Sequence, residues 1–210
     1  MASREWDMPR ITQTEKAHNR QRIVDAASRL FRCRGIDAVG IADLMKAAGL
    51  THGGFYNHFA SKDALVTEVC DAAFADSLGL LADLLCQDAE GEPLARVVDD
   101  YLSPAHRDAV DGGCPSASLV GGVRIQSDQV QAAYARGVEG YLTGFADQIT
   151  RDAARNGQDL DPAEARHQAV RLFSELVGAM VLSRAVRRVE PTLSDEFLRL
   201  AEYTRTAARA

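Results

Sequence analysis

The sequence predicts an all-α fold. Apolar residues recur at helical spacing along almost the whole chain, and glycine or proline falls at the junctions between these stretches. No strand pattern, internal repeat or low-complexity tract interrupts them. The chain has 210 residues, of which 46% are hydrophobic, so it can bury a sizeable core. We expect about nine helices.

The first third of the chain contains three closely spaced helices. Four apolar residues at helical spacing predict the first, from about Glu15 to Arg34: Ile23, Ala27, Leu30 and Phe31. Gly35 ends it as a C-cap. A second helix covers about Ile41 to Ala48 and ends at Gly49, and a short third one covers about His52 to Phe59. Residues 1–13 lack periodicity and are expected to form a flexible basic arm.

Six further helices are predicted in the remainder. Ser61 and Ser127 are expected to cap two long ones, Asn156-Gly157 ends the second of these, and residues 103–115 are expected to form a loop. The predicted helices run from Lys62 to about Leu85, from Pro93 to about Leu102, over 116–125, from Ser127 to about Arg155, from Pro162 to about Val189, and, beyond Pro191, from about Ser194 to Arg209.

Charge is distributed unevenly along the chain. The formal net charge is −6, but residues 1–62 hold ten Lys and Arg against six Asp and Glu. The remainder holds fourteen against 24. A basic first third on an acidic body is typical of a protein that offers one end to phosphate groups.

Helices two and three, joined by a tight turn, predict a helix-turn-helix whose second helix enters the DNA major groove. Phe55 and Phe59 lie four residues apart and should face the core. Gly53 and Gly54 favour close approach of the backbone to DNA. The outward-facing residues available for DNA contact are then Thr51, His52, Gly53, Tyr56, Asn57 and His58. An alternative for Tyr56 and His58 is that they are half-buried and cap the small core.

This region resembles the DNA-binding region of the TetR (tetracycline-repressor) family. The motif residues present here are Ala48, Gly49, Leu50, Thr51, Phe55, Tyr56, His58, Phe59, Lys62 and Leu65. The sequence departs from the family at Gly40, where a Thr or Ser cap is usual, and at Met45, where Ala is favoured. The resemblance also places Lys62 in the DNA-contacting set. Tyr56 and Lys62 would contact the DNA backbone and so position the protein, and His52, Gly53 and Asn57 would read bases.

The resemblance also implies the domain organisation and the partners. Residues 14–61 would form the helix-turn-helix DNA-binding domain, and residues 62–210 a ligand-binding and dimerisation domain. The expected function is a homodimeric repressor that a small-molecule effector releases from a pseudo-palindromic stretch of double-stranded operator DNA. The expected dimer-interface residues are Leu176, Met180, Phe197 and Ala201, with ordinary intramolecular core as the alternative.

Candidate ligand contacts are residues on the middle helices that combine apolar and polar character. They are Phe74, Leu78, Leu102, His106, Cys114, Tyr134, Tyr141, Phe145 and Phe173.

The segment from His106 to Pro115 permits several interpretations. Cys114 follows two glycines and precedes a proline, so it either begins a helix as a reactive thiol that senses oxidants or electrophiles, or it is a small buried residue in a structural loop. His106, Arg107 and Asp108 form either a hydrogen-bonded cluster that fixes the loop or, with Cys114, the groups of an enzyme. A metal site formed by Cys86, His106, Asp108 and Cys114 is a third alternative.

A DNA-binding regulator remains the expected class, with no catalytic residues, metal or cofactor. The N-terminus lacks the apolar core of a signal peptide, and no run of 18 apolar residues exists. We therefore expect no membrane association and a cytoplasmic location. The four cysteines show no CxxC spacing. The effector, the operator and the regulated genes are not encoded in any of these patterns.

Overall fold

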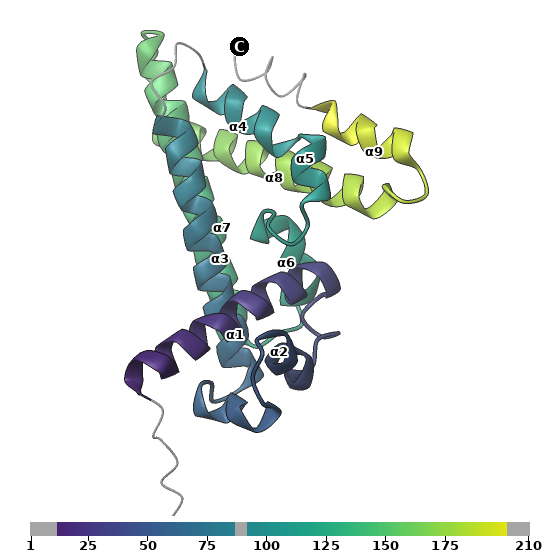
Figure 1. Ribbon diagram of the computed structural model, residues 1–210. Helices are drawn as coiled ribbons and strands as arrows, with labels where there is room; N and C mark the ends of the chain where they lie inside the picture. Colours follow the sequence, from purple (N-terminus) through teal and green to yellow (C-terminus); the bar gives the residue numbers. More distant parts are fainter. Residues whose placement is uncertain (1–11, 87–91, 201–210) are drawn as a thin grey trace, which may run out of the picture.

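The computed structural model describes residues 12–86 and 92–200, which form helices joined by turns and contain no strand (Figure 1). The elements are α1 (Gln13–Arg34), α2 (Ile41–Ala47), the 3₁₀ helix η1 (His52–Asn57), α3 (Lys62–Cys86), α4 (Pro93–Tyr101), α5 (Pro104–Asp108), α6 (Pro115–Val123), α7 (Asp128–Arg155), α8 (Pro162–Val186) and α9 (Pro191–Leu198). The predicted all-α class is confirmed. Among the described helices, none has the length and apolarity that a membrane span requires.

The small N-terminal unit consists of α1, α2 and η1, gathered at one end of α3 (Figure 1). Thr12 and Glu15 form a capping box that starts α1, and Gly35 ends it with φ of 85°, as its predicted C-cap role requires. Phe31, Leu44 and Phe55 are buried in the core of this unit, which continues into α3. The predicted arm, residues 1–13, falls almost entirely outside the described residues.

The long helices α3 and α7 lie side by side and form the body of the molecule (Figure 1). Two glycines of α7 permit this close approach. A Cβ atom at Gly137 would overlap the ring of Phe74, and one at Gly140 would lie 2.5 Å from Leu78 Cδ1. These two glycines of α7 therefore determine how closely α3 can pack against it.

Helix α8 packs against α7 on one side and α9 on the other. Leu176 and Met180 are 1% and 0% exposed within the single chain, so they belong to its own core. This contradicts their assignment to a dimer surface and favours the intramolecular alternative. Phe197 is half-buried against the same core, and Ala201 lies outside the described residues.

Several local expectations need correction. The third helix is 3₁₀ rather than α, as expected for a short segment with two adjacent glycines. Residues 104–108 form α5, because the Ser103 hydroxyl accepts the His106 N–H and Pro104 occupies the first turn. Pro191 begins α9 instead of preceding it. Ser127 stands at the N-cap of α7 without a side-chain cap bond, whereas the predicted cap by Ser61 is present.

Candidate DNA-recognition surface and ligand pocket

The helix-turn-helix segment has one buried and one exposed face. Phe55 and Phe59 are buried, and their rings stack with centroids 5.7 Å apart. Tyr56 is 66% exposed, and Asn57 lies exposed beside it. Thr51, His52 and Gly53 are also exposed. The structure therefore places five of the seven predicted DNA-contacting residues on one open surface.

His58 is the sixth and is half-buried. Burial lowers its pKa, and the nearby cations Lys16 and Arg20 lower it further. Its Nδ1 atom is buried without a hydrogen-bond partner in the structure. These surroundings agree with the alternative that His58 caps the small core, whereas Tyr56 does not fit it.

Lys62, the seventh, begins α3. Its ammonium donates a hydrogen bond to the carbonyl oxygen of Ile36 at 2.6 Å and lies 5.9 Å from the centroid of the Phe31 ring. In this structure the lysine thus ties α3 to the turn after α1. Thr51 stands at the N-cap of η1, but its hydroxyl makes no cap bond.

Arg20 of α1 holds the helix-turn-helix segment in place, a role that the sequence analysis did not predict. Its guanidinium lies 4.0 Å from the centroid of Phe59, donates to the carbonyl of His58, and pairs with Glu68 of α3. Its spacing from Ile23 and Ala27 on α1 places it near the apolar stripe, which is the sequence signal that would have found it.

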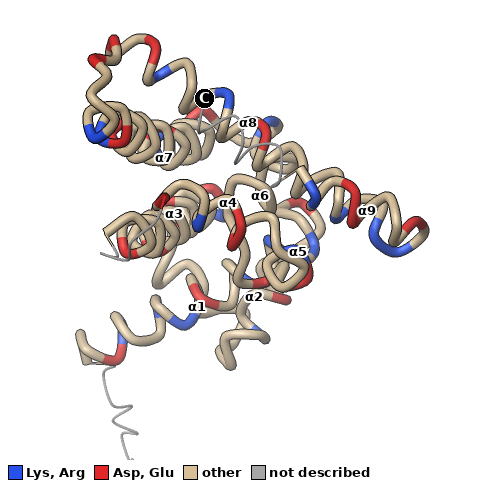
Figure 2. Tube along the Cα trace, turned by 90° about the horizontal axis from the view of Figure 1, so that it is seen from above, with Lys and Arg blue, Asp and Glu red and all other residues tan. Residues whose placement is uncertain are grey.

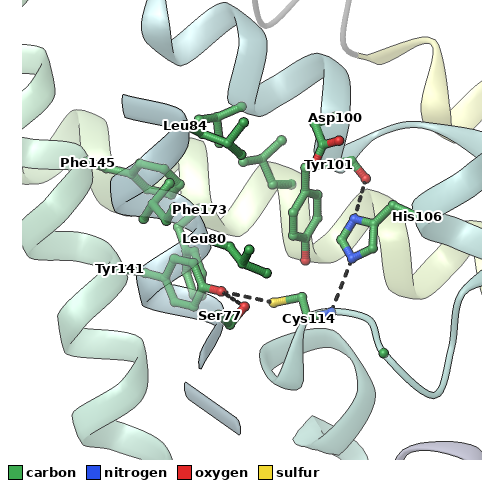
Figure 3. A pocket seen from close by; sticks show the side chains of 14 residues that line it. Ser77, Leu80, Leu84, Asp100, Tyr101, His106, Cys114, Tyr141, Phe145 and Phe173 are labelled. Carbon is green, nitrogen blue, oxygen red and sulfur yellow. Dashed lines mark hydrogen bonds between the residues drawn. The ribbon is translucent and has the colours of Figure 1, made fainter. Parts of the chain in front are cut away.

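A pocket opens between α3, α4, α5, α7, α8 and the segment before α6. Its wall contains four aromatic rings, those of Tyr101, Tyr141, Phe145 and Phe173, with Tyr141 and Phe173 stacked at 5.3 Å (Figure 3). Its lining residues are Ser77, Leu80, Leu81, Leu84, Val97, Asp100, Tyr101, His106, Gly112, Cys114, Tyr141, Phe145, Phe173 and Leu176.

Five of the nine predicted ligand residues line this pocket: His106, Cys114, Tyr141, Phe145 and Phe173. The other four, Phe74, Leu78, Leu102 and Tyr134, do not. Phe74 packs edge-on against Tyr134, and Leu78 faces Gly140, so these three side chains belong to the close contact between α3 and α7. Leu102 is buried in the core just after α4. Tyr101 was missed, although it follows Val97 by one helical turn and both line the pocket.

The polar groups of the pocket form a connected set (Figure 3). His106 Nδ1 lies 2.9 Å from the carbonyl oxygen of Tyr101, and His106 Nε2 accepts the amide N–H of Cys114 at 3.2 Å. Since a carbonyl only accepts, Nδ1 carries the proton and the ring is neutral. Burial lowers the pKa of His106 and so favours this form.

Cys114 and Tyr141 meet inside the pocket. The Cys114 thiol lies 3.9 Å from the Tyr141 hydroxyl, which also shares a hydrogen bond with Ser77. Burial raises the pKa of Tyr141, and the neighbouring thiol raises it further, so this hydroxyl stays protonated. Cys114 stands at the N-cap of α6, as the predicted helix start requires, and is only 4% exposed, which agrees with the alternative of a small buried cysteine.

Arg107 holds α5 against α9. It is 3% exposed, and it donates to Asp108 at 2.8 Å, Asp195 at 2.6 Å and Ser194 at 3.2 Å. Basic and acidic positions accordingly lie together where α5 meets α9 (Figure 2). The predicted hydrogen-bonded cluster is confirmed for Arg107 and Asp108.

This geometry does not bring together the groups named in the enzyme and metal alternatives. His106 accepts a backbone amide instead of contacting the Cys114 thiol, and Asp108 pairs with Arg107, so the three groups form no catalytic chain. Within residues 12–86 and 92–200, no three His, Cys, Asp or Glu side chains gather as metal ligands.

An exposed helix-turn-helix segment on a helical body with an internal pocket defines a DNA-binding regulator. The family model of bacterial regulatory proteins, tetR family, matches residues 23–69. The chain is 40% identical to the HTH-type transcriptional regulator AcrR of Shigella flexneri over 62 residues, which cover 30% of this chain and 29% of that protein. It is 29% identical to the HTH-type transcriptional repressor DhaR of Mycobacterium sp. over 186 residues, covering 85% and 88%.

A solved structure supports the same fold. The reduced form of Escherichia coli NemR superposes with a TM-score of 0.71 at 23% identity, covering 89% of this chain and 96% of that one. Residues 23–69 therefore form a DNA-binding domain of the tetR-family type, and the chain is a DNA-binding transcriptional regulator similar over most of its length to HTH-type transcriptional repressors.

Proposed function

We propose that the protein is a homodimeric repressor, released from a pseudo-palindromic operator by a small molecule that binds in the pocket. The observation that carries this proposal is the course of α3. Its first residue, Lys62, bonds to the turn after α1, and its residues Ser77, Leu80 and Leu84 line the pocket. A ligand that shifts α3 therefore acts on the recognition segment through one continuous helix.

Helix α6 offers a second connection, which sequence reasoning did not identify. Gly122 of α6 lies against Ile36, since a Cβ there would be 3.4 Å from Ile36 Cδ1. Just beyond α6, Gln126 donates to Asp37 at 2.9 Å. Because Cys114 at the start of α6 lines the pocket, movement of this helix would also reach the turn that holds Lys62.

For the recognition surface, we propose that Asn57, His52 and the backbone at Gly53 contact bases, and that Tyr56 and Thr51 contact phosphates. His58 would act by supporting the segment. Lys62 would reach a phosphate only by giving up its bond to Ile36. Two subunits would place their η1 segments about 34–36 Å apart, or somewhat more, on successive major grooves.

For the dimer, we propose the exposed face of α8 together with α9. Val170 and Leu182 are large apolar residues exposed on α8, and Leu193 is exposed on α9. Between Val170 and Leu182, Ser174 and Gly178 continue the stripe at helical spacing, and such small side chains allow a second helix to approach closely. This face replaces Leu176 and Met180 as the candidate interface. Residues 12–61 would be the DNA-binding part and the helices from α3 onward the regulatory part.

Repression and induction can be tested by fluorescence anisotropy on DNA from directly upstream of the gene. We expect tight, salt-sensitive binding that the Tyr56→Ala, Asn57→Ala double variant loses. Since coupling is reciprocal, an effector must bind more weakly to the operator complex by the same factor with which it weakens DNA binding. Equal effector affinity with and without operator would refute induction.

A second candidate function is covalent sensing at Cys114, which its position favours. The thiol lines the pocket, and the Arg32 and Arg184 guanidinium groups lie close enough to interact with it electrostatically. A thiolate there could add to an α,β-unsaturated carbonyl: sulfur bonds to the β-carbon, the C=C π bond opens, and the α-carbon takes a proton. The bacterial cytoplasm, where operator DNA is held, is the compartment in which either function would operate.

Acrolein provides the test of this second function. Cys33 and Cys86 are exposed and would react first, so the Cys33→Ser, Cys86→Ser protein is the starting point. Covalent sensing requires that acrolein add one adduct to this protein and abolish operator binding, with both effects absent after Cys114→Ala. Adduct formation without loss of operator binding would exclude it.

A further inference from the structure

A second hollow adjoins the aromatic pocket. It lies between α1, α3 and the segment that precedes Cys114. The two hollows share Ser77, Leu80 and Gly112. A single molecule that reached from one hollow into the other would pass these three residues.

The two hollows differ in chemical character. The first is walled by rings and leucines. The second is lined mainly by charged and small residues: Asp25, Ser28, Arg29, Arg32, Ala73, Asp76, Ser77, Leu80, Gly112 and Gly113. A ligand that fills both must be apolar at one end and polar at the other.

Arg32, in the last turn of α1, is the group in the second hollow that best fits an anion. Its Nη1 donates to the carbonyl of Gly113 at 2.8 Å and more weakly to that of Asp111 at 3.4 Å. Its Nε is buried and has no hydrogen-bond partner in the structure. Within the part of the chain that the structure describes, no carboxylate lies at ion-pair distance from its guanidinium.

A partly buried guanidinium with an unmet donor is unusual, because buried cations are normally paired. Burial lowers the pKa of Arg32, though an arginine remains protonated at neutral pH. Asp76 and Asp111 attract the Arg32 charge from beyond ion-pair distance. Both, like Asp25, are exposed to solvent, which screens their charge. Asp25 also accepts a hydrogen bond from Gln21. An oxyanion would satisfy Arg32 where these residues do not.

We propose that the effector is an amphipathic molecule whose apolar body fills the aromatic pocket and whose oxyanionic head group binds Arg32 in the adjoining hollow; this inference rests on the proposed function. A carboxylate or a phosphate would serve equally, because a guanidinium binds both in bidentate geometry. The head group would compete with the carbonyl of Gly113 for Arg32. Because Arg32 belongs to α1, this exchange loosens the link between the DNA-binding unit and the segment that carries Cys114.

Ten-carbon probes that differ only in the head group provide the test: decanoate, decyl phosphate and decanol, titrated by calorimetry. The wild-type protein should bind decanoate or decyl phosphate roughly tenfold or more tightly than decanol, the effect of one hydrogen bond to a charged group. Arg32→Gln should remove this preference and leave the affinity for decanol unchanged. Arg34→Gln is the matched control, since Arg34 is an exposed arginine of the same last turn of α1 that lines neither hollow.

Three outcomes would overturn the inference: decanol bound as tightly as the anions, no binding of either anion, or an anion preference that survives Arg32→Gln. A preference for only one of the two anions upholds it and identifies the head group. Operator binding by both arginine variants is measured in parallel. If wild-type protein binds operator but shows no anion preference, this inference alone fails, whereas absence of operator binding counts against the proposed function.

Discussion

Gly137 of α7 lies directly against the ring of Phe74 on α3, with no room for a Cβ atom between them. Gly137→Ala should therefore push α3 and α7 apart or force Phe74 from its rotamer, at a cost of about 1–3 kcal/mol in the free energy of unfolding. Chemical denaturation measures this loss. Gly79→Ala on α3 is the matched control, because nothing lies within 4 Å of a Cβ there.

The control should be neutral or more stable, by up to about 1 kcal/mol, because alanine favours a helix more than glycine does. Equal behaviour of the two variants would show that α3 and α7 are not held in this close contact in solution. Since α3 also lines the pocket, the Gly137 variant should bind effector more weakly as well.

Arg20 of α1 contacts the segment after η1, through the Phe59 ring and the carbonyl of His58, and also contacts α3, through Glu68. Arg20→Met keeps the aliphatic stem and removes these polar links. We expect a loss of about 1 kcal/mol in stability, modest because the pair is partly solvated. Operator affinity should fall as the recognition segment loosens.

The stability measurement separates this anchoring role from a direct DNA contact, which would lower affinity alone. Arg136→Met is the control, since Arg136 forms an exposed ion pair with Asp71 between α7 and α3. Its loss should cost less than about 0.5 kcal/mol. If both variants keep wild-type stability, the anchoring role is wrong.

The exposed face of the candidate DNA-recognition surface was largely predictable because its geometry is local. The spacing of Phe55 and Phe59 indicates which side of η1 and of the turn after it is buried, and Tyr56 and Asn57 then face outward. His58 and Lys62 departed from expectation for a non-local reason. The positions of Lys16 and Arg20 on α1, and of the carbonyl of Ile36, become neighbours only after folding.

The pocket was only partly predictable because five helices contribute to it. Phe74 and Phe145 look alike in sequence, yet Phe74 is held in the contact between α3 and α7 while Phe145 faces the pocket. Leu176 and Met180 lie on a stripe wider than one helical face. Such a stripe indicates two packed sides, but not which side meets the chain's own core and which remains open.

His106 gives the protein a predictable response to pH. Burial holds its pKa below the ordinary value of 6.5 in the folded state, with Arg184 lowering it further and Asp100 and the Tyr101 carbonyl opposing. The unfolded chain therefore takes up a proton at higher pH than the folded chain. Stability from this residue is present above pH 6.5 and is lost as pH falls toward the folded-state pKa.

Denaturation curves at about pH 7.5 and about pH 5.5 test this response. The free energy of unfolding should fall on acidification, with His58 contributing in the same direction. His106→Gln retains hydrogen-bonding groups but does not titrate, so its pH dependence should be shallower. His167→Gln, at an exposed position, should keep the wild-type slope, and an unchanged slope in His106→Gln would contradict the assignment.

The dimer face can be tested with one charge. Leu182 is 49% exposed on α8 and belongs to the proposed interface. Leu182→Glu would bury one charge from each subunit in the dimer, and desolvating these charges should raise the dissociation constant by roughly a hundredfold or more. Sedimentation velocity over a range of concentrations measures this directly.

Ile125→Glu is the control, because Ile125 is similarly exposed but lies just beyond α6. That variant should remain dimeric. Loss of the dimer in Leu182→Glu should also weaken operator binding, since a single recognition segment reads only one half-site. A dimer that persists in Leu182→Glu but dissociates in Ile125→Glu would move the interface from α8 and α9 to the surface around α6.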